Sequence, residues 1–174
     1  SRTTLQMNNG VIEKWCYNNL ESNCTGYGGW YQWDELMNYT QNEGTQGICP
    51  SGWHIPTYGE FIALTEFAGG SQQAGTALNE AGKFHWNYYS WQGTNTSGFT
   101  WLGNGYVLFG KNGLMKSVGY LWTSSKRTCA DVPGYEPWAD NPELYNVYYS
   151  ANNWGAVVNP ALRYTGDGYG VRCI

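Results

Sequence analysis

Two segments of the chain, 30–39 and 57–68, place apolar and aromatic residues at helical spacing. Within the second, Thr57 and Glu60 stand three residues apart, as in a capping box. Gly69-Gly70 follows that segment in the manner of a glycine C-cap. The pattern therefore predicts two helices, over 30–39 and 57–68.

Downstream of Asn79 no helical period persists, and short aromatic or β-branched runs alternate with Gly and Asn, which is typical of antiparallel strands. An earlier strand is predicted over 11–16, and it leads into a short polar turn over 17–23. The stretch 126–143 holds three prolines and several acids, so we expect a long excursion there. The predicted downstream strands are 99–102, 105–109, 119–124, 144–150, 155–158 and 168–173.

The length of 174 residues fits one domain, 1–174, with a core large enough to fold without metal. Ten Trp and 15 Tyr are more aromatic surface than such a core can hide, so some of them are expected to face a ligand. A net charge of −4 without a basic cluster argues against nucleic acid. No apolar run approaches the roughly 20 residues that span a bilayer, so we expect no membrane insertion; a removed leader or anchor stays open.

Five cysteines allow at most two disulfides and one free thiol. Cys16 and Cys24 bracket the predicted polar turn and suit a local staple, whereas Cys49 and Cys173 would close nearly the whole domain. Cys129 is then left over. Reduced thiols in a cytosolic protein are the alternative; the favoured location is extracellular, on a cell surface or on a virion surface.

Several motifs occur in a fixed order along the chain, and together they resemble the Fibrobacter succinogenes major paralogous domain over essentially its whole length. The longest of them joins a cysteine, two prolines and two glycines to Trp53, His54 and Ile55. The motifs are Asn9 to Asn19, Asn23-Cys24, Tyr27 to Glu35, Gly47 to Thr57, Ser97-Gly98-Phe99, Gly119 to Ser125 and Gly170 to Cys173.

The resemblance implies an α+β domain of C-type lectin-like fold, with two helices packed on antiparallel sheets and long irregular loops. The positions that match this fold are His54 to Thr57 and Gly170 to Cys173. The family looks like a relative of the formylglycine-generating, sulfatase-modifying proteins and of the variable proteins of diversity-generating retroelements. It implies a ligand surface on the last strands and loops.

An enzyme of the formylglycine-generating type would need a closely spaced pair of reactive cysteines near the C-terminal end, and only Cys173 lies there. Two histidines, His54 and His85, are too few and too far apart for a zinc pattern. We therefore predict no catalysis and no cofactor, and we interpret His54 as a structural residue of the motif.

Two kinds of position are candidates for calcium. Glu136-Pro137-Trp138 and Asn152-Asn153-Trp154 are imperfect matches to the calcium and sugar motifs of C-type lectins. The acids Asp131, Asp140 and Glu143 could supply oxygen ligands. A solvated loop is the favoured interpretation.

The segment 144–174 contains no Lys, Glu, Gln or Met, although these types are common upstream. Adenine-directed mutagenesis of Asn codons gives Tyr, Ser, Asp, Gly, Ala, Val, Leu and Arg but never those four or Trp, so Trp154 would be a fixed residue. Strand composition alone gives a similar depletion, and both explanations stay open. The diversification hypothesis nominates Tyr145, Asn146, Tyr148, Tyr149, Asn152, Asn153, Asn159, Arg163 and Tyr164 as exposed recognition positions.

The sequence thus predicts a non-catalytic ligand-binding or display protein, in its favoured form the variable receptor-binding protein of a diversity-generating retroelement. Tyr and Asn would supply rigid contacts and adaptable hydrogen bonds to a protein or glycan partner. The alternative is a carbohydrate-binding module or adhesin of a secreted or cell-surface system.

Overall fold

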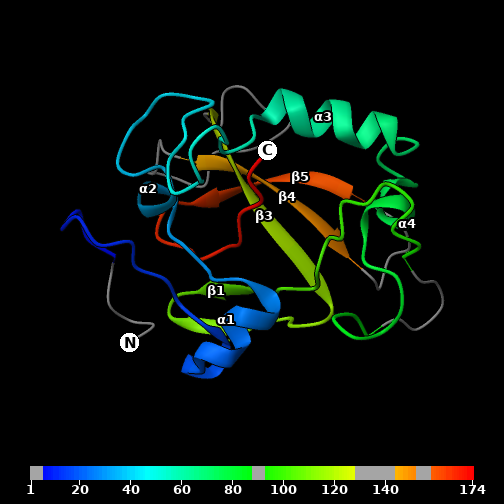
Figure 1. Cartoon of the computed structure of the whole chain (residues 1–174), viewed down its shortest axis with the longest axis horizontal. Helices are drawn as coiled ribbons and strands as arrows, with labels where there is room; N and C mark the ends of the chain where they lie inside the picture. Colours follow the sequence, from blue (N-terminus) through cyan, green and yellow to red (C-terminus); the bar gives the residue numbers. More distant parts are fainter. Residues whose placement is uncertain (1–5, 88–92, 128–143, 152–157) are drawn as a thin grey trace.

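The structure, a computed structural model, describes residues 6–87, 93–127, 144–151 and 158–174. Figure 1 shows a three-stranded sheet in the middle, with α3 on one side and α1 with the β1–β2 hairpin on the other. The elements are η1 (Tyr17–Asn19), α1 (Glu21–Tyr27), α2 (Trp33–Leu36), α3 (Tyr58–Phe67), α4 (Ala74–Leu78), β1 (Tyr106–Leu108), β2 (Lys111–Gly113), β3 (Val118–Arg127), β4 (Leu144–Ala151) and β5 (Val158–Tyr164).

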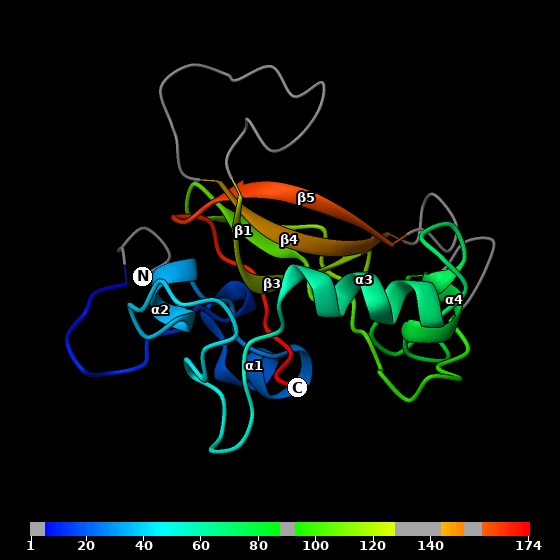
Figure 2. The ribbon, with the colours of Figure 1, turned by 90° about the horizontal axis from the view of Figure 1, so that it is seen from above.

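The predicted α+β class is confirmed as a small domain of helices and antiparallel sheets. The main sheet has the order β3-β4-β5, and both pairings are antiparallel. Within the described residues, β5 forms one edge of this sheet, and Figure 2 shows it on the outer side. The Val158 N–H points away from β4 and donates to Ser71 O. Residues two apart on a strand direct their N–H groups to the same side, so Pro160 removes a donor from this outer side of β5. A proline there blunts the edge against further strand pairing.

The second predicted helix is confirmed as α3, and its capping box is complete. The Thr57 hydroxyl accepts from Glu60 N at 3.2 Å, and the Glu60 carboxylate accepts from Thr57 N at 2.7 Å. Burial alone would raise the pKa of Glu60, but the hydrogen bonds from Thr57 and His54 outweigh it and lower the pKa. At the other end, Gly70 N donates to Thr65 O, and both Gly69 and Gly70 have positive φ.

The first predicted helix, 30–39, is wrong in its extent, because only α2 forms there. Trp30 pairs with Trp15 and Tyr31 with Tyr169 in antiparallel bridges, so the segment enters in an extended conformation. Asn38 and Tyr39 then adopt positive φ of 51° and 57° and end the helix. Tertiary pairing at one end and a left-handed turn at the other therefore limit the helical period.

The N-terminal prediction of a strand over 11–16 and a polar turn over 17–23 is also corrected. Val11 and Ile12 are 65% and 59% exposed, and the segment contributes only the Trp15 bridge. The polar stretch folds as η1 and α1 instead of a turn. The reason is local: residues 17–25 contain no glycine or proline that would interrupt a helix.

Three predicted strands are confirmed with small shifts, as β1, β3 and β4, and a fourth, 155–158, extends instead from Val158 to Tyr164 as β5. The predicted strands 99–102 and 168–173 contribute only isolated bridges, from Trp101 and from Gly168 to Gly170. Residues 155–157, and the stretch 128–143 of the expected excursion, lie outside the described residues.

The core is built largely from tryptophan. Five tryptophan indoles are at most 2% exposed. Four of them donate their N–H to backbone carbonyls at 2.8–2.9 Å. The fifth, Trp101 Nε1, is buried without a partner. The four hydrogen-bonded indoles thus fill the core without leaving their own N–H unpaired. These tryptophans are Trp30, Trp33, Trp86, Trp101 and Trp122.

Candidate functional site

Strands β4 and β5 carry seven of the nine predicted recognition positions side by side. Asn152 and Asn153, which precede β5, lie outside the described residues. The positions on β4 are Tyr145, Asn146, Tyr148 and Tyr149, and those on β5 are Asn159, Arg163 and Tyr164.

The strand register divides these positions between the two faces of the sheet. Tyr145 is paired with Arg163 and Tyr149 with Asn159, and paired residues share a face. Positions offset by one residue belong to the opposite face. That second set contains Asn146, Tyr148 and Tyr164. The nominated positions on β4 and β5 therefore form two sets, one on each face of the sheet.

Strand β3 shows what supports each face. Tyr149 and Val147 are the register partners of Tyr120 and Trp122, which are buried in the core with Trp33 and Tyr169. On the other face, Tyr148 is paired with Leu121, which is buried against α3 and α4. Each set thus has one member, Tyr149 or Tyr148, that is paired with a buried residue of β3.

Arg163 is held by a group of buried side chains and is half-buried, in contrast to the exposed position that the sequence predicts. Its guanidinium carbon lies 5.8 Å from the centre of the Tyr120 ring. Burial alone would lower the pKa of Arg163, but the hydroxyls of Tyr169 and Tyr120 outweigh it and raise the pKa. Tyr164, one residue on, is 40% exposed. Arg163 therefore has a supporting role in the fold whatever else it contacts.

Asp167 completes this group from the turn that follows β5. It is 5% exposed, and Tyr169 Oη donates to its Oδ2 at 3.4 Å. Burial raises the pKa of Asp167 to about 6, although the positive charge of Arg163 opposes the rise. An ionised carboxylate is thus kept in a poorly solvated position at neutral pH.

We expect the variant D167N to gain stability relative to the parent as the pH rises. The unfolded carboxyl titrates near 3.8 and the folded one near 6, so the parent loses stability between these values. The free energy of unfolding of D167N minus that of the parent should therefore rise by about 3 kcal/mol between pH 3.5 and pH 7. Urea denaturation across this range measures it, with the exposed E66Q as control. A difference that does not change with pH would contradict the burial argument.

A cleft of about 340 Å³, here called the α1 cleft, lies between the C-terminal end of α1, the loop 99–104 and the chain end. No sequence pattern predicts this cleft, although glycine and aromatic residues are concentrated in 26–31 on its α1 side. Its lining includes Thr25 to Gly29, Tyr31, Phe99 to Leu102, Asn104, Leu121 and Gly170 to Arg172.

The comparison with family models decides the relationship of the chain. The model of the Fibrobacter succinogenes major domain matches residues 3–174. The chain belongs to this family. Comparisons with curated proteins and with solved structures find no match. The resemblance stated from the motifs is confirmed at the level of the family.

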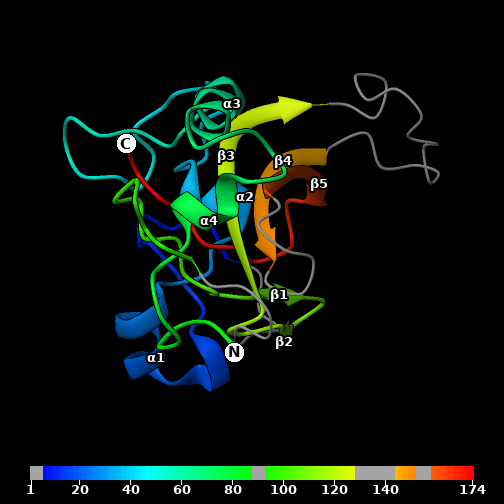
Figure 3. The ribbon, with the colours of Figure 1, turned by 90° about the vertical axis from the view of Figure 1, so that its right-hand side faces the viewer.

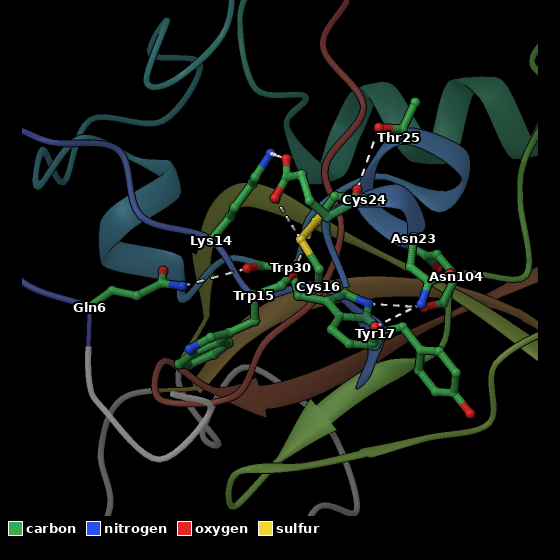
Figure 4. The surroundings of a disulfide bond; sticks show 11 residues. Gln6, Lys14, Trp15, Cys16, Tyr17, Asn23, Cys24, Thr25, Trp30 and Asn104 are labelled. Carbon is green, nitrogen blue, oxygen red and sulfur yellow. Dashed lines mark hydrogen bonds and ion pairs between the residues drawn. A yellow bond between two sulfur atoms is a disulfide. The ribbon is translucent and has the colours of Figure 1, made fainter. Parts of the chain in front are cut away.

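Both predicted disulfides are present in this Fibrobacter succinogenes major domain. Cys49 is bonded to Cys173 over a separation of 124 residues, and Cys16 to Cys24 over 8. Figure 4 shows the Cys16–Cys24 bond beside Lys14, whose ammonium is 2.6 Å from Glu21. Because the two sulfurs are bonded to each other, they and Glu21 do not offer a thiolate site for a metal.

The remaining predicted positions are distributed as follows in the family domain. His54 Nε2 lies 3.0 Å from Glu60 Oε1 beside the capping box, as a structural residue of the motif would. His85 Nδ1 lies 2.8 Å from Glu80 Oε1 in a separate part of the chain. Among the described residues, no helix has the length and apolar character needed to cross a bilayer. Cys129 and the residues weighed for calcium, Asp131, Glu136-Pro137-Trp138, Asp140, Glu143 and Asn152-Asn153-Trp154, lie outside the described residues.

Proposed function

We propose that this domain is a non-catalytic ligand-binding and display protein whose recognition positions lie on β4 and β5. The observation that carries the proposal is the pairing of β4 with β5, since these adjacent strands together hold seven nominated positions. The partner would be a protein or a glycan. Tyrosine and asparagine suit this task because they combine rigid aromatic area with adaptable hydrogen bonding.

In its specific form, the proposal is that the segment 144–174 is diversified by a retroelement on a C-type lectin-like scaffold. Support comes from the order of α2, the 47–57 motif, α3 and the terminal segment, and from the pairing of His54 with Ile174 in both directions. Two disulfides favour an oxidising location, extracellular or on a cell or virion surface.

The DNA that flanks the gene tests the diversification directly. We expect a reverse transcriptase gene and a near-identical template repeat that differs from the coding segment only at adenines. Absence of both would reject the retroelement, although binding by β4 and β5 would remain open.

A display library tests whether these positions can be exchanged. We expect protease resistance to survive randomisation with NNY codons at Tyr145, Asn146, Tyr148, Tyr149 and Asn159. The control library randomises the buried β3 positions Val118, Tyr120, Leu121 and Trp122, and it should lose most folded members because core substitutions typically cost 2–5 kcal/mol. Equal losses in both libraries would contradict a swappable surface.

A carbohydrate-binding module or adhesin is the second candidate function, and the α1 cleft is the observation that favours it. A glycan array, with and without a chelator, separates the two candidates. Retention on specific glycans supports the second, and loss of that retention with chelator would add a calcium requirement. An oxidase of the formylglycine-generating type ranks third, because only Cys173 of the required cysteine pair is present at the C-terminal end and it is bonded to Cys49.

A further inference from the structure

The α1 cleft has the size and the mixed lining of a small-molecule site. Its volume of about 340 Å³ falls within the roughly 300–1,000 Å³ typical of such sites. It is built from three separate parts of the chain, α1, the loop 99–104 and the chain end, which Figure 3 shows on the side of the molecule away from β5. A ligand there would not compete with the proposed recognition strands.

One wall of the cleft presents hydrogen-bond acceptors. The five carbonyl groups from Thr25 to Gly29 accept no hydrogen bond within the described part of the chain. These carbonyls lie at and just beyond the C-terminal end of α1, and the last carbonyls of a helix have no intrahelical partner. The Gly28 N–H donates to Cys24 O as the last bond of the helix, so the carbonyls that follow Cys24 are left for a ligand. Ligand hydroxyl groups are the matching donors.

The chain end contributes one cation, Arg172, to the lining of the cleft. Arg172 is exposed, donates to Phe99 O and stacks over the Phe99 ring with its guanidinium carbon 5.2 Å from the ring centre. Among the described residues no carboxylate lies within ion-pair distance of it. Since Arg has five N–H donors, most of them remain for a ligand, and a carboxylate is the planar partner that fits them best.

Aromatic rings supply the apolar part of the lining. Tyr27 and Tyr31 are half-buried at the α1 side, and Phe99 meets the buried Trp101 edge to face with ring centres 5.7 Å apart. The two half-buried tyrosine rings suit the C–H surface of a sugar ring, while their hydroxyls stay polar. Acceptors, a single cation and aromatic faces are thus combined in one cleft.

We infer that the α1 cleft binds an acidic saccharide, with the carboxylate of a uronic acid on Arg172, hydroxyls on the carbonyls of Thr25 to Gly29 and a ring face against the aromatic lining. This inference rests on the second candidate function and is independent of the display surface. To the carbohydrate-binding candidate it adds the class of ligand, an acidic saccharide, and the residue that selects the acid, Arg172.

Binding of trigalacturonate to the whole chain, measured calorimetrically in buffer with a chelator, tests the inference against trigalacturonate methyl ester as the uncharged probe. We expect saturable binding of the acid that weakens with added salt, and at least about ten-fold weaker binding of the ester. R172Q should weaken acid binding by about ten-fold or more, and R172K by less because it keeps the charge. K111Q, which removes an exposed lysine of β2, should have no effect.

A steric block gives a second test that does not depend on Arg172. Gly26 lies in α1 and lines the cleft; its φ is not positive, and an added Cβ meets nothing within 4 Å. G26L should therefore fold and abolish binding, whereas G59L, the matched helical glycine on α3, should bind like the parent. Equal binding of acid and ester, unchanged binding in G26L, or no binding of trigalacturonate overturns the inference. If neutral glycans still bind in that last case, the second candidate function survives without it.

Discussion

Replacing Cys49 and Cys173 together by alanine is expected to lower the free energy of unfolding by about 5 kcal/mol, because their bond closes a loop of 124 residues in the unfolded chain. For a chain of this size the melting temperature should fall by roughly 10–20 °C. Urea denaturation of the parent and the variant, both under oxidising conditions, measures the difference. The bond ties the 47–57 motif to the terminal segment that carries Arg172, so trigalacturonate binding should weaken with it.

The second disulfide supplies the matched control. The variant C16A/C24A removes a bond that closes only 8 residues, for which the same chain-entropy relation gives about 2.5 kcal/mol. The ratio of the two losses is the decisive quantity. If C16A/C24A costs as much as the C49A/C173A variant, loop closure is not the source of the stabilisation.

Local signals account for the parts of this fold that the sequence predicts well. The capping box of Thr57 and Glu60 and the following glycines define α3 within a stretch of 14 residues, 57–70. Cysteine spacing likewise suggests both disulfide pairs. Each of these features depends on residues close in sequence or on a type that has few possible partners.

The elements that were missed depend on distant partners. The helix predicted over 30–39 is shortened because Trp30 pairs with Trp15 and Tyr31 with Tyr169. The residues near 30 and 31 in the sequence do not predict these two bridges. The two faces of β4 and β5 follow from the register with β3, which a list of residue types does not contain. Arg163 is the clearest case, since only the fold brings the Tyr120 ring of β3 to its guanidinium.

The α1 cleft was missed for the same reason. Its acceptors come from backbone carbonyls of Thr25 to Gly29, and side-chain identity says little about which carbonyls remain available. Arg172 is part of a recognised motif, yet its position beside Phe99 depends on a pairing across 73 residues. Such sites are assembled by tertiary structure, so a sequence pattern indicates at most one of their walls.

The variant W122A is expected to lose about 3–5 kcal/mol, because Trp122 is fully buried at the junction of the sheet and the core. Its Nε1 donates to Tyr31 O at 2.8 Å, and its ring meets Tyr169 edge to face at 4.8 Å. W122F keeps most of the volume and should lose about 1–2 kcal/mol, chiefly through the missing hydrogen bond. The control W53A truncates an indole that is 53% exposed and should change stability by about 0.5 kcal/mol or less.

The same substitution links the core to the recognition strands. Trp122 is the register partner of Val147, so its truncation should speed hydrogen exchange of the β4 amides more than that of the α3 amides. A loss in W122A no larger than in W53A would show that the indole does not support the sheet. Uniform acceleration of exchange in α3 and β4 would instead mean that truncation lowers only the global stability, and that β4 has no separate dependence on Trp122.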